Sequence, residues 1–217
     1  MHPKTLDDLA TRTPAGKFSD LTAELTATRN ESATLATHWG KFYSCQHTVE
    51  AFIGKGVVVC DWEERKAAMA ASGTAWCILR RMPAPTATQR AEAKLVMDQQ
   101  TGRTPGSQAL EYSKAELVLQ ALDHKLEDLT GRPSFFFRKL GNLLPARVIC
   151  SKSSALVDIA VGMLPGRAQY MAPDGLWDLK YDGQLGQQYA IVDCSDSWAD
   201  MMRALSVPIR RHPDCNG

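Results

Sequence analysis

The stretch ARVICSKSSALVDIAVGML, residues 146–164, constrains the fold of this 217-residue chain more than any other segment. A short β-branched run, Val148 and Ile149, gives way to small hydroxyl residues and then to a helical apolar stripe. The apolar positions recur at helical spacings on one side, and further valines widen that side until little polar surface remains. These positions are Ala155, Leu156, Val157, Ile159, Ala160, Val161 and Met163. We therefore expect a helix that the rest of the chain almost surrounds.

The segments around this helix predict a mixed α and β architecture. Alternating residues, two glycines and a valine run in HTVEAFIGKGVVVCD predict a β-hairpin over 47–61. Other strands are expected over 20–29, 74–82 and 187–193, and helices over 31–43, 61–73, 88–100 and 113–129. Segment 134–145 fits either a strand or a helix, segment 165–179 is predicted to be loop, and the tail is expected to be loose. The chain reads as one α+β domain over 1–217, with a helical insertion at about 86–132 forming one wall of a cleft.

Cys150 lies at the junction between the β-branched run and the predicted buried helix. Helix N-termini carry unpaired amide groups and the positive end of the helix dipole, and both favour an anion. A thiolate is such an anion, and cysteine pKa values are lowered at helix starts. The position therefore suits a nucleophile. A buried structural cysteine before a core helix is the alternative.

A cysteine nucleophile needs a base, and the sequence contains five histidines. His2 and His212 lie near the chain ends, and His124 lies among charged residues of a predicted helix. His38 falls in the short helix predicted over 31–43, where it would cap or pack. His47 opens the predicted hairpin, on a rigid element that can hold an imidazole in place.

Two stretches, CQHTVEAFIGKGVVVCD with His47 and the later VICSKSSALVDIAVG with Cys150, together resemble the circularly permuted papain-like cysteine hydrolases. This is the NlpC-like group that includes YiiX-type proteins and relatives of lecithin:retinol acyltransferase. In that group a histidine begins a strand and the nucleophile follows at the start of a buried helix, the reverse of papain's order. Segment 20–44 also resembles the group's first strand and loop, and MAPDGLWDL resembles the segment after its nucleophile helix.

The resemblance implies a permuted papain-like fold, with a small antiparallel sheet packed on the helix that carries the nucleophile. It makes Cys150 the nucleophile and His47 the general base, with amides at the helix start, those of Cys150 and Ser151, supporting the oxyanion. The implied activity is that of a thiol hydrolase, a cysteine peptidase or amidase that cleaves an amide or peptide bond through an acyl-enzyme. A cell-wall peptide or a protein conjugate is the expected substrate, and neither a metal nor an organic cofactor is needed.

A third polar group is expected to orient the imidazole, and the hairpin register decides which residue supplies it. A three-residue loop over 54–56 places Asp61 on the sheet face of His47, whereas a two-residue loop over 54–55 places Cys60 there. We favour Asp61 because a carboxylate accepts a hydrogen bond from the ring, although Asp61 is also the predicted cap of the next helix. Glu50 falls on the opposite face in either register and is predicted to be a solvated charge.

Four alternatives compete with this hypothesis. Cys45, His47, Cys60 and Cys194 offer soft ligands for zinc, but their spacing matches no common structural zinc pattern. There is no G-x-S-x-G elbow for a serine hydrolase, so Ser151 and Ser153 are expected to cap the helix. A binding or inhibitory module on the same scaffold, or an acyltransferase or esterase acting on lipid, is the other candidate function.

Charge and targeting signals narrow the setting. The 25 basic and 24 acidic residues leave a net charge of +1, which does not point to nucleic acid or an anionic membrane. We find neither an apolar run long enough to span a membrane nor the plan of a secretion signal at the start. We therefore expect a soluble, cytoplasmic protein in which most of the six cysteines are reduced thiols.

Overall fold

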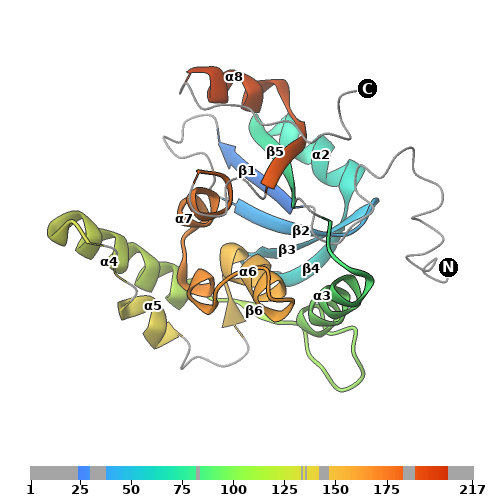
Figure 1. Ribbon diagram of the computed structural model, residues 1–217, viewed down its shortest axis with the longest axis horizontal. Helices are drawn as coiled ribbons and strands as arrows, with labels where there is room; N and C mark the ends of the chain where they lie inside the picture. Colours follow the sequence, from blue (N-terminus) through green and yellow to red (C-terminus); the bar gives the residue numbers. More distant parts are fainter. Residues whose placement is uncertain are drawn as a thin grey trace.

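A computed structural model describes residues 24–29, 38–81, 84–132, 134, 136–141, 147–182 and 189–204 (Figure 1). Residues 1–23 and the tail after residue 204 lie outside these ranges. The described part is mixed α and β, as the sequence predicts. Among the described helices, none combines the length and the apolar character that crossing a bilayer demands.

A six-stranded sheet forms the centre of the fold, and every neighbouring pair of its strands is antiparallel. Its spatial order is β4-β3-β2-β1-β5-β8. The predicted hairpin is confirmed as β3 and β4, and the other predicted strands are confirmed as β1, β5 and β8. The bounds are β1 Glu24–Arg29, β2 His38–Ser44, β3 His47–Phe52, β4 Gly56–Asp61, β5 Thr74–Arg81 and β8 Tyr189–Cys194.

Strand β2 occupies the place where the sequence predicted a short helix, so that prediction was wrong. The residues of β2 alternate between the two faces of the sheet, and the strand is bonded to β1 on one side and β3 on the other. Trp39 and Phe42 are both fully buried, although they face opposite sides. Pairing on two sides and burial on two faces outweigh the helical spacing of the apolar residues in this segment.

The helices confirm three predictions and correct one. Helices α2, α3 and α4 match the segments predicted over 61–73, 88–100 and 113–129, and the ambiguous segment contains the short helix α5. The predicted loop over 165–179 instead holds three short helical turns, η2, α7 and η3, because its apolar residues, Trp177 among them, pack into the core. The bounds are α2 Trp62–Ala71, α3 Ala87–Gln100, α4 Lys114–Thr130, α5 Phe136–Gly141, η2 Gly166–Tyr170, α7 Pro173–Trp177, η3 Asp178–Asp182 and α8 Asp196–Ala204.

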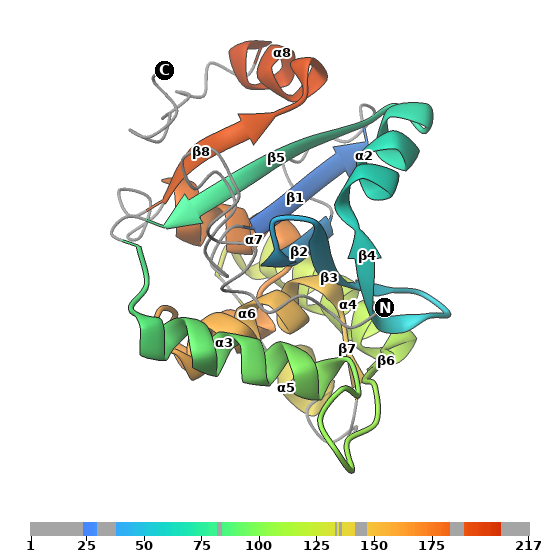
Figure 2. The same cartoon turned by 90° about the vertical axis from the view of Figure 1, so that its right-hand side faces the viewer.

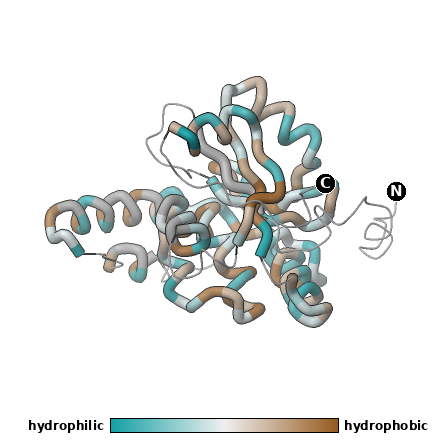
Figure 3. Tube along the Cα trace, turned by 45° about the horizontal axis from the view of Figure 1, so that its top comes forward, coloured by the Kyte–Doolittle hydropathy of each residue, from teal (hydrophilic) through white to brown (hydrophobic). Residues whose placement is uncertain are grey.

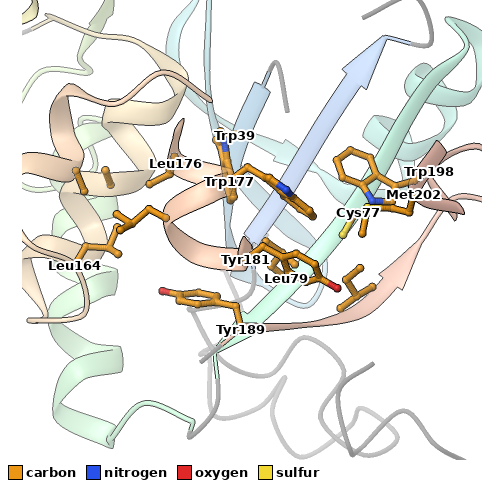
Figure 4. Close-up of a cluster of buried hydrophobic side chains, with 14 of the residues drawn as sticks. Trp39, Cys77, Leu79, Leu164, Leu176, Trp177, Tyr181, Tyr189, Trp198 and Met202 are labelled. Carbon is orange, nitrogen blue, oxygen red and sulfur yellow. The ribbon is translucent and has the colours of Figure 1, made fainter. Parts of the chain in front are cut away.

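Helix α6, Cys150–Ala160, is the predicted buried helix. It packs against β2, β3 and α3 on one face of the sheet, while α2 covers the other face (Figures 1 and 2). One hydrophobic cluster joins α6 to Trp39, Trp177 and the α8 residue Trp198 (Figure 4). By contrast, α4 projects away from the sheet, and the hydropathy of its trace alternates along its length (Figure 3).

A buried group of charges ties α6 to the sheet. The carboxylate of Asp158 accepts hydrogen bonds from Lys41 Nζ on β2 at 2.6 Å and from Lys180 Nζ on η3 at 2.7 Å. All three side chains are at most 2 % exposed. The Lys180 ammonium also lies over the rings of Trp39 and Tyr189. Removing any one of these three charges should destabilise the fold strongly, because a buried charge without a partner has a high desolvation cost.

A second, two-stranded sheet leads the chain into α6. Strands β6, Glu111–Tyr112, and β7, Arg147–Val148, run parallel, with Tyr112 opposite Val148. The β3–β4 hairpin contacts both strands, and the amide of Val57 donates to the carbonyl of Leu110 at 2.8 Å. Helix α6 begins two residues after β7 ends. The hairpin, β6 and the start of α6 therefore meet in one region.

Gly56 makes this close approach possible. Its φ of +74° lies in the left-handed region, and a Cβ added there would clash with the carbonyl oxygen of Leu110. We expect Gly56→Ala to destabilise the fold by about 1–3 kcal/mol from backbone strain, with a further cost from the clash. Gly54→Ala is the matched control, since Gly54 has a φ of +80° but open space around it. Urea unfolding of both variants measures the difference, and equal losses would contradict the close approach.

Candidate active site

Cys150 is the first residue of α6 and is only 5 % exposed. The preceding residue, Ile149, provides no side-chain cap for the helix. The predicted capping by two serines is wrong: Ser151 donates to the carbonyl of Met171 at 2.9 Å, and Ser153 donates to the Gln100 side chain at 3.0 Å. No side chain of the described residues therefore caps the start of α6, and the amide of Ser151 instead donates to the Cys150 sulfur.

The histidine that bonds to Cys150 is His38, the first residue of β2. Its Nε2 lies 2.8 Å from Oε2 of Glu50, so Nδ1 is the ring nitrogen left for the sulfur. The backbone N–H of Trp39 also donates to the sulfur, which places Cys150 against the beginning of β2. The ring of Phe52, on β3, stacks on the imidazole with centroids 5.2 Å apart. The imidazole is therefore held from three directions.

Glu50 on β3 fixes the far side of the His38 ring. It is 1 % exposed, which makes the prediction of a solvated charge wrong. Besides His38, its carboxylate accepts from Thr48 Oγ1 at 2.6 Å and from Arg65 Nε at 3.0 Å. Gly40 lies directly opposite on β2, and a Cβ there would come 2.7 Å from the Glu50 side chain. Glycine at position 40 thus leaves room for the carboxylate to lie across β2.

The electrostatics of the pair favour a thiolate and an imidazolium. Burial raises the pKa of the Cys150 thiol, but the hydrogen bond and charge of His38, with the two backbone amides, bring the pKa below its ordinary value. Burial lowers the pKa of His38, but Cys150 and Glu50 outweigh it and raise this pKa to about 9. The pKa of Glu50 falls to about 2 against its burial, mainly through His38 and Arg65. These shifts match an ion pair oriented by a carboxylate.

His47 and Asp61, predicted as base and orienting residue, occupy other positions. They lie directly opposite one another on β3 and β4. The hairpin loop spans residues 53–55, so the pairing register differs from both of the predicted ones. His47 Nδ1 lies 3.0 Å from Ser44 Oγ, and Asp61 accepts from the amide of Glu64 as the cap of α2. The structure thus confirms the capping role of Asp61 and assigns the histidine beside Cys150 to His38.

Cys60, the other candidate for the orienting position, lies opposite Thr48 on β4. Its pKa is raised to about 11, chiefly by burial and by the charge of Glu50. It remains a thiol at neutral pH and is a poor hydrogen-bond acceptor for an imidazole. Glu50 holds the position that was predicted for Asp61 or Cys60.

The zinc alternative does not assemble. Cys60 lies on β4 at one edge of the sheet, while Cys194 lies on β8 at the opposite edge. Within the described ranges, no group of three or more histidine, cysteine and acidic side chains is arranged to hold a metal ion. The five cysteines in these ranges are free thiols.

Tyr112 is a further neighbour of the sulfur, and no sequence pattern marked it as a site residue. It packs against the hydrophobic cluster that contains Cys150, and its pKa is raised by burial and by the charge of Cys150. The phenol therefore stays protonated and can donate a hydrogen bond close to the nucleophile.

Comparison with known proteins returns no match for this chain, whether with family models, with curated proteins or with solved structures. The positions of Cys150, His38 and Glu50 are therefore the basis on which a function is assigned. Sulfur, imidazole and carboxylate in this order can serve as a thiol nucleophile, its base and the group that orients the base.

Proposed function

We propose that this protein is a thiol hydrolase that cleaves an amide or peptide bond, with Cys150 as nucleophile, His38 as general base and acid, and Glu50 as the residue that positions His38. One observation carries the proposal. Cys150 stands at an uncapped helix start and bonds to an imidazole whose other nitrogen is held by a buried carboxylate. A structural cysteine needs no such partners.

The reaction follows from these positions. The Cys150 thiolate attacks the substrate carbonyl, and the amides at the start of α6 stabilise the negative charge that develops on the carbonyl oxygen. His38 then gives its proton to the leaving nitrogen as the carbon–nitrogen bond breaks, which leaves a thioester on Cys150. Neutral His38 next takes a proton from water, the resulting hydroxide attacks the thioester, and the acid is released with the thiolate restored.

A permuted papain-like fold is part of the proposal. Two features support it: an antiparallel sheet packs on the helix that begins with the nucleophile, and the histidine strand precedes that helix in the chain. Both agree with the group that the sequence resembles, although its histidine corresponds to His38 here and not to His47. A cell-wall peptide or a protein conjugate remains the proposed substrate class.

Alkylation with iodoacetamide over a range of pH, followed site by site with mass spectrometry, tests the proposal. Because its pKa is lowered, we expect Cys150 to react at pH values below the ordinary thiol pKa of about 8.5. Cys60 is the internal control, because its raised pKa makes it slow there. Equal and sluggish labelling of the two thiols would favour a binding module over an enzyme.

Turnover should follow a bell-shaped pH profile. Activity rises as Cys150 loses its proton, below the range of a free thiol, because its pKa is lowered. Activity falls again as the pH passes about 9, where His38 loses the proton that the leaving group needs. Hydrolysis of small amides and thioesters, screened across pH, measures both limbs. A profile that still rises well above pH 9 would exclude His38 as the acid.

A further inference from the structure

A cavity of about 370 Å³ opens between the tip of the β3–β4 hairpin, segment 109–112 and the start of α4. Gly54, Lys55 and Gly56 form one side of it, and Glu111, Tyr112 and Lys114 are among the residues of the other. The segment predicted as a helical insertion, about 86–132, therefore supplies much of the cavity wall. A volume of this size accommodates a small polar group of a ligand.

Two connections place the cavity beside the candidate active site. The hairpin tip follows directly after Phe52, whose ring stacks on His38. On the other side, Tyr112 lines the cavity and also packs against the cluster that contains Cys150. The cavity and the cluster that contains Cys150 therefore share Tyr112.

The charges around the cavity are mostly positive. Lys55, Lys114 and Arg147 line it, and the carboxylate among the lining residues, Glu111, is bound to Arg147 at 3.1 Å. Within the described part of the chain, neither Lys55 nor Lys114 forms an ion pair. The first residues of α4 also line the cavity, and amides at a helix start add to the positive potential. An anionic group gains from all of these, whereas a cation does not.

We propose that this cavity binds an anionic group of the substrate, a carboxylate or a phosphate, next to the bond that Cys150 attacks. The inference rests on the proposed function, because it takes the cavity as a subsite of the same reaction. Lys55 and Lys114 are its specificity-determining residues. The substrate class narrows from amides in general to amides that carry a negative charge close to the scissile bond.

Three bromoacetyl reagents of similar length test the charge preference. They are the bromoacetyl amides of β-alanine, of ethanolamine phosphate and of β-alaninamide, which carry a carboxylate, a phosphate and a neutral amide. In each case the Cys150 thiolate displaces bromide and forms a thioether, so the rate reports how well the tail fits. We expect at least one anionic reagent to react faster than the neutral one, by about two- to fivefold for each lysine that it reaches. The preference should shrink as salt is added.

Variants assign the preference to the cavity. Lys55→Gln with Lys114→Gln should bring the rates with anionic and neutral reagents close together. Lys66→Gln is the matched control, because Lys66 is a lysine on α2 that pairs with the exposed Glu63 and does not line the cavity. The anion attraction of His38 itself is present in every variant and cancels from the comparison.

The outcomes separate the two proposals. If all three reagents label wild-type Cys150 rapidly and equally, the anionic subsite is wrong and the thiol hydrolase stands. The subsite is also wrong if a charge preference survives the loss of both lysines. If even the neutral reagent labels Cys150 no faster than Cys60, the proposed function fails and the subsite fails with it. A preference for the phosphate reagent over the carboxylate reagent, or the reverse, identifies which anion the cavity binds.

Discussion

His38→Ala should abolish the fast alkylation of Cys150 at neutral pH and lower turnover by about 10²–10⁴-fold, the usual contribution of a general base. The reason is that the hydrogen bond and charge of His38 lower the pKa of Cys150 against the effect of burial. Without the imidazole, burial is the largest remaining effect on that pKa, and it favours the neutral thiol over the thiolate. The pH dependence of iodoacetamide labelling, measured beside turnover, records both losses.

His47→Ala is the matched control, since His47 lies at the start of β3 but contacts Ser44. It should leave the labelling of Cys150 and the turnover unchanged. The opposite ranking of the two variants would restore His47 as the base. If His38→Ala does not fold, Glu50→Gln provides the test, because it keeps an acceptor for Nε2 but removes the charge that helps to raise the pKa of His38. The alkaline limb of the pH profile should then move to lower pH.

Asp158→Asn should cost about 3–5 kcal/mol of unfolding free energy, the range seen when one partner of a buried ion pair is removed. The substitution keeps the shape of the side chain but leaves Lys41 and Lys180, both fully enclosed, without the carboxylate that joins them. Because the three residues link β2, α6 and η3, the substitution should lower the free energy of unfolding of the whole molecule. Urea unfolding followed by circular dichroism measures it.

Asp200→Asn on α8 is the matched control. Asp200 also pairs with a basic residue, Arg203, but both side chains are more than two-thirds exposed. Exposed pairs contribute little, so this variant should unfold like the wild type. Equal stability of Asp158→Asn and Asp200→Asn would show that the buried group is not needed to hold α6 on the sheet.

Local sequence patterns predicted most of the elements but not all of their neighbours. Strong local signals mark the hairpin over 47–61, through alternation with glycines, and the helices α2, α3 and α4, which begin at side-chain caps. The buried helix α6 is marked by the helical spacing of its apolar residues. β2 was mistaken for a helix because its apolar residues happen to match helical spacing. Only its pairing with β1 and β3, formed by distant segments, makes it a strand.

The site was predicted in part for the same reason. The Cys150 position follows from one continuous stretch, so its sequence was enough to single it out. His38 was set aside because it was placed in a helix. Glu50 was set aside because it lies on the sheet face opposite to that of His47. With β2 assigned as a strand, Gly40 lies opposite Glu50 and His38 stacks on Phe52. These residues can then be recognised as sharing one face of the sheet. The sequence signal for the site was a histidine two residues before a glycine in one strand, His38 and Gly40, with Glu50 opposite the glycine in the next strand.

The sulfur and its imidazole come from distant parts of the chain, since β2 belongs to its first quarter and α6 to its last third. A polypeptide still emerging from the ribosome, or one that has not closed α6 onto the sheet, carries Cys150 as an ordinary thiol. Under the proposed function, Cys150 therefore becomes reactive only once α6 has closed onto the sheet, and an incompletely folded copy does not attack the molecules around it.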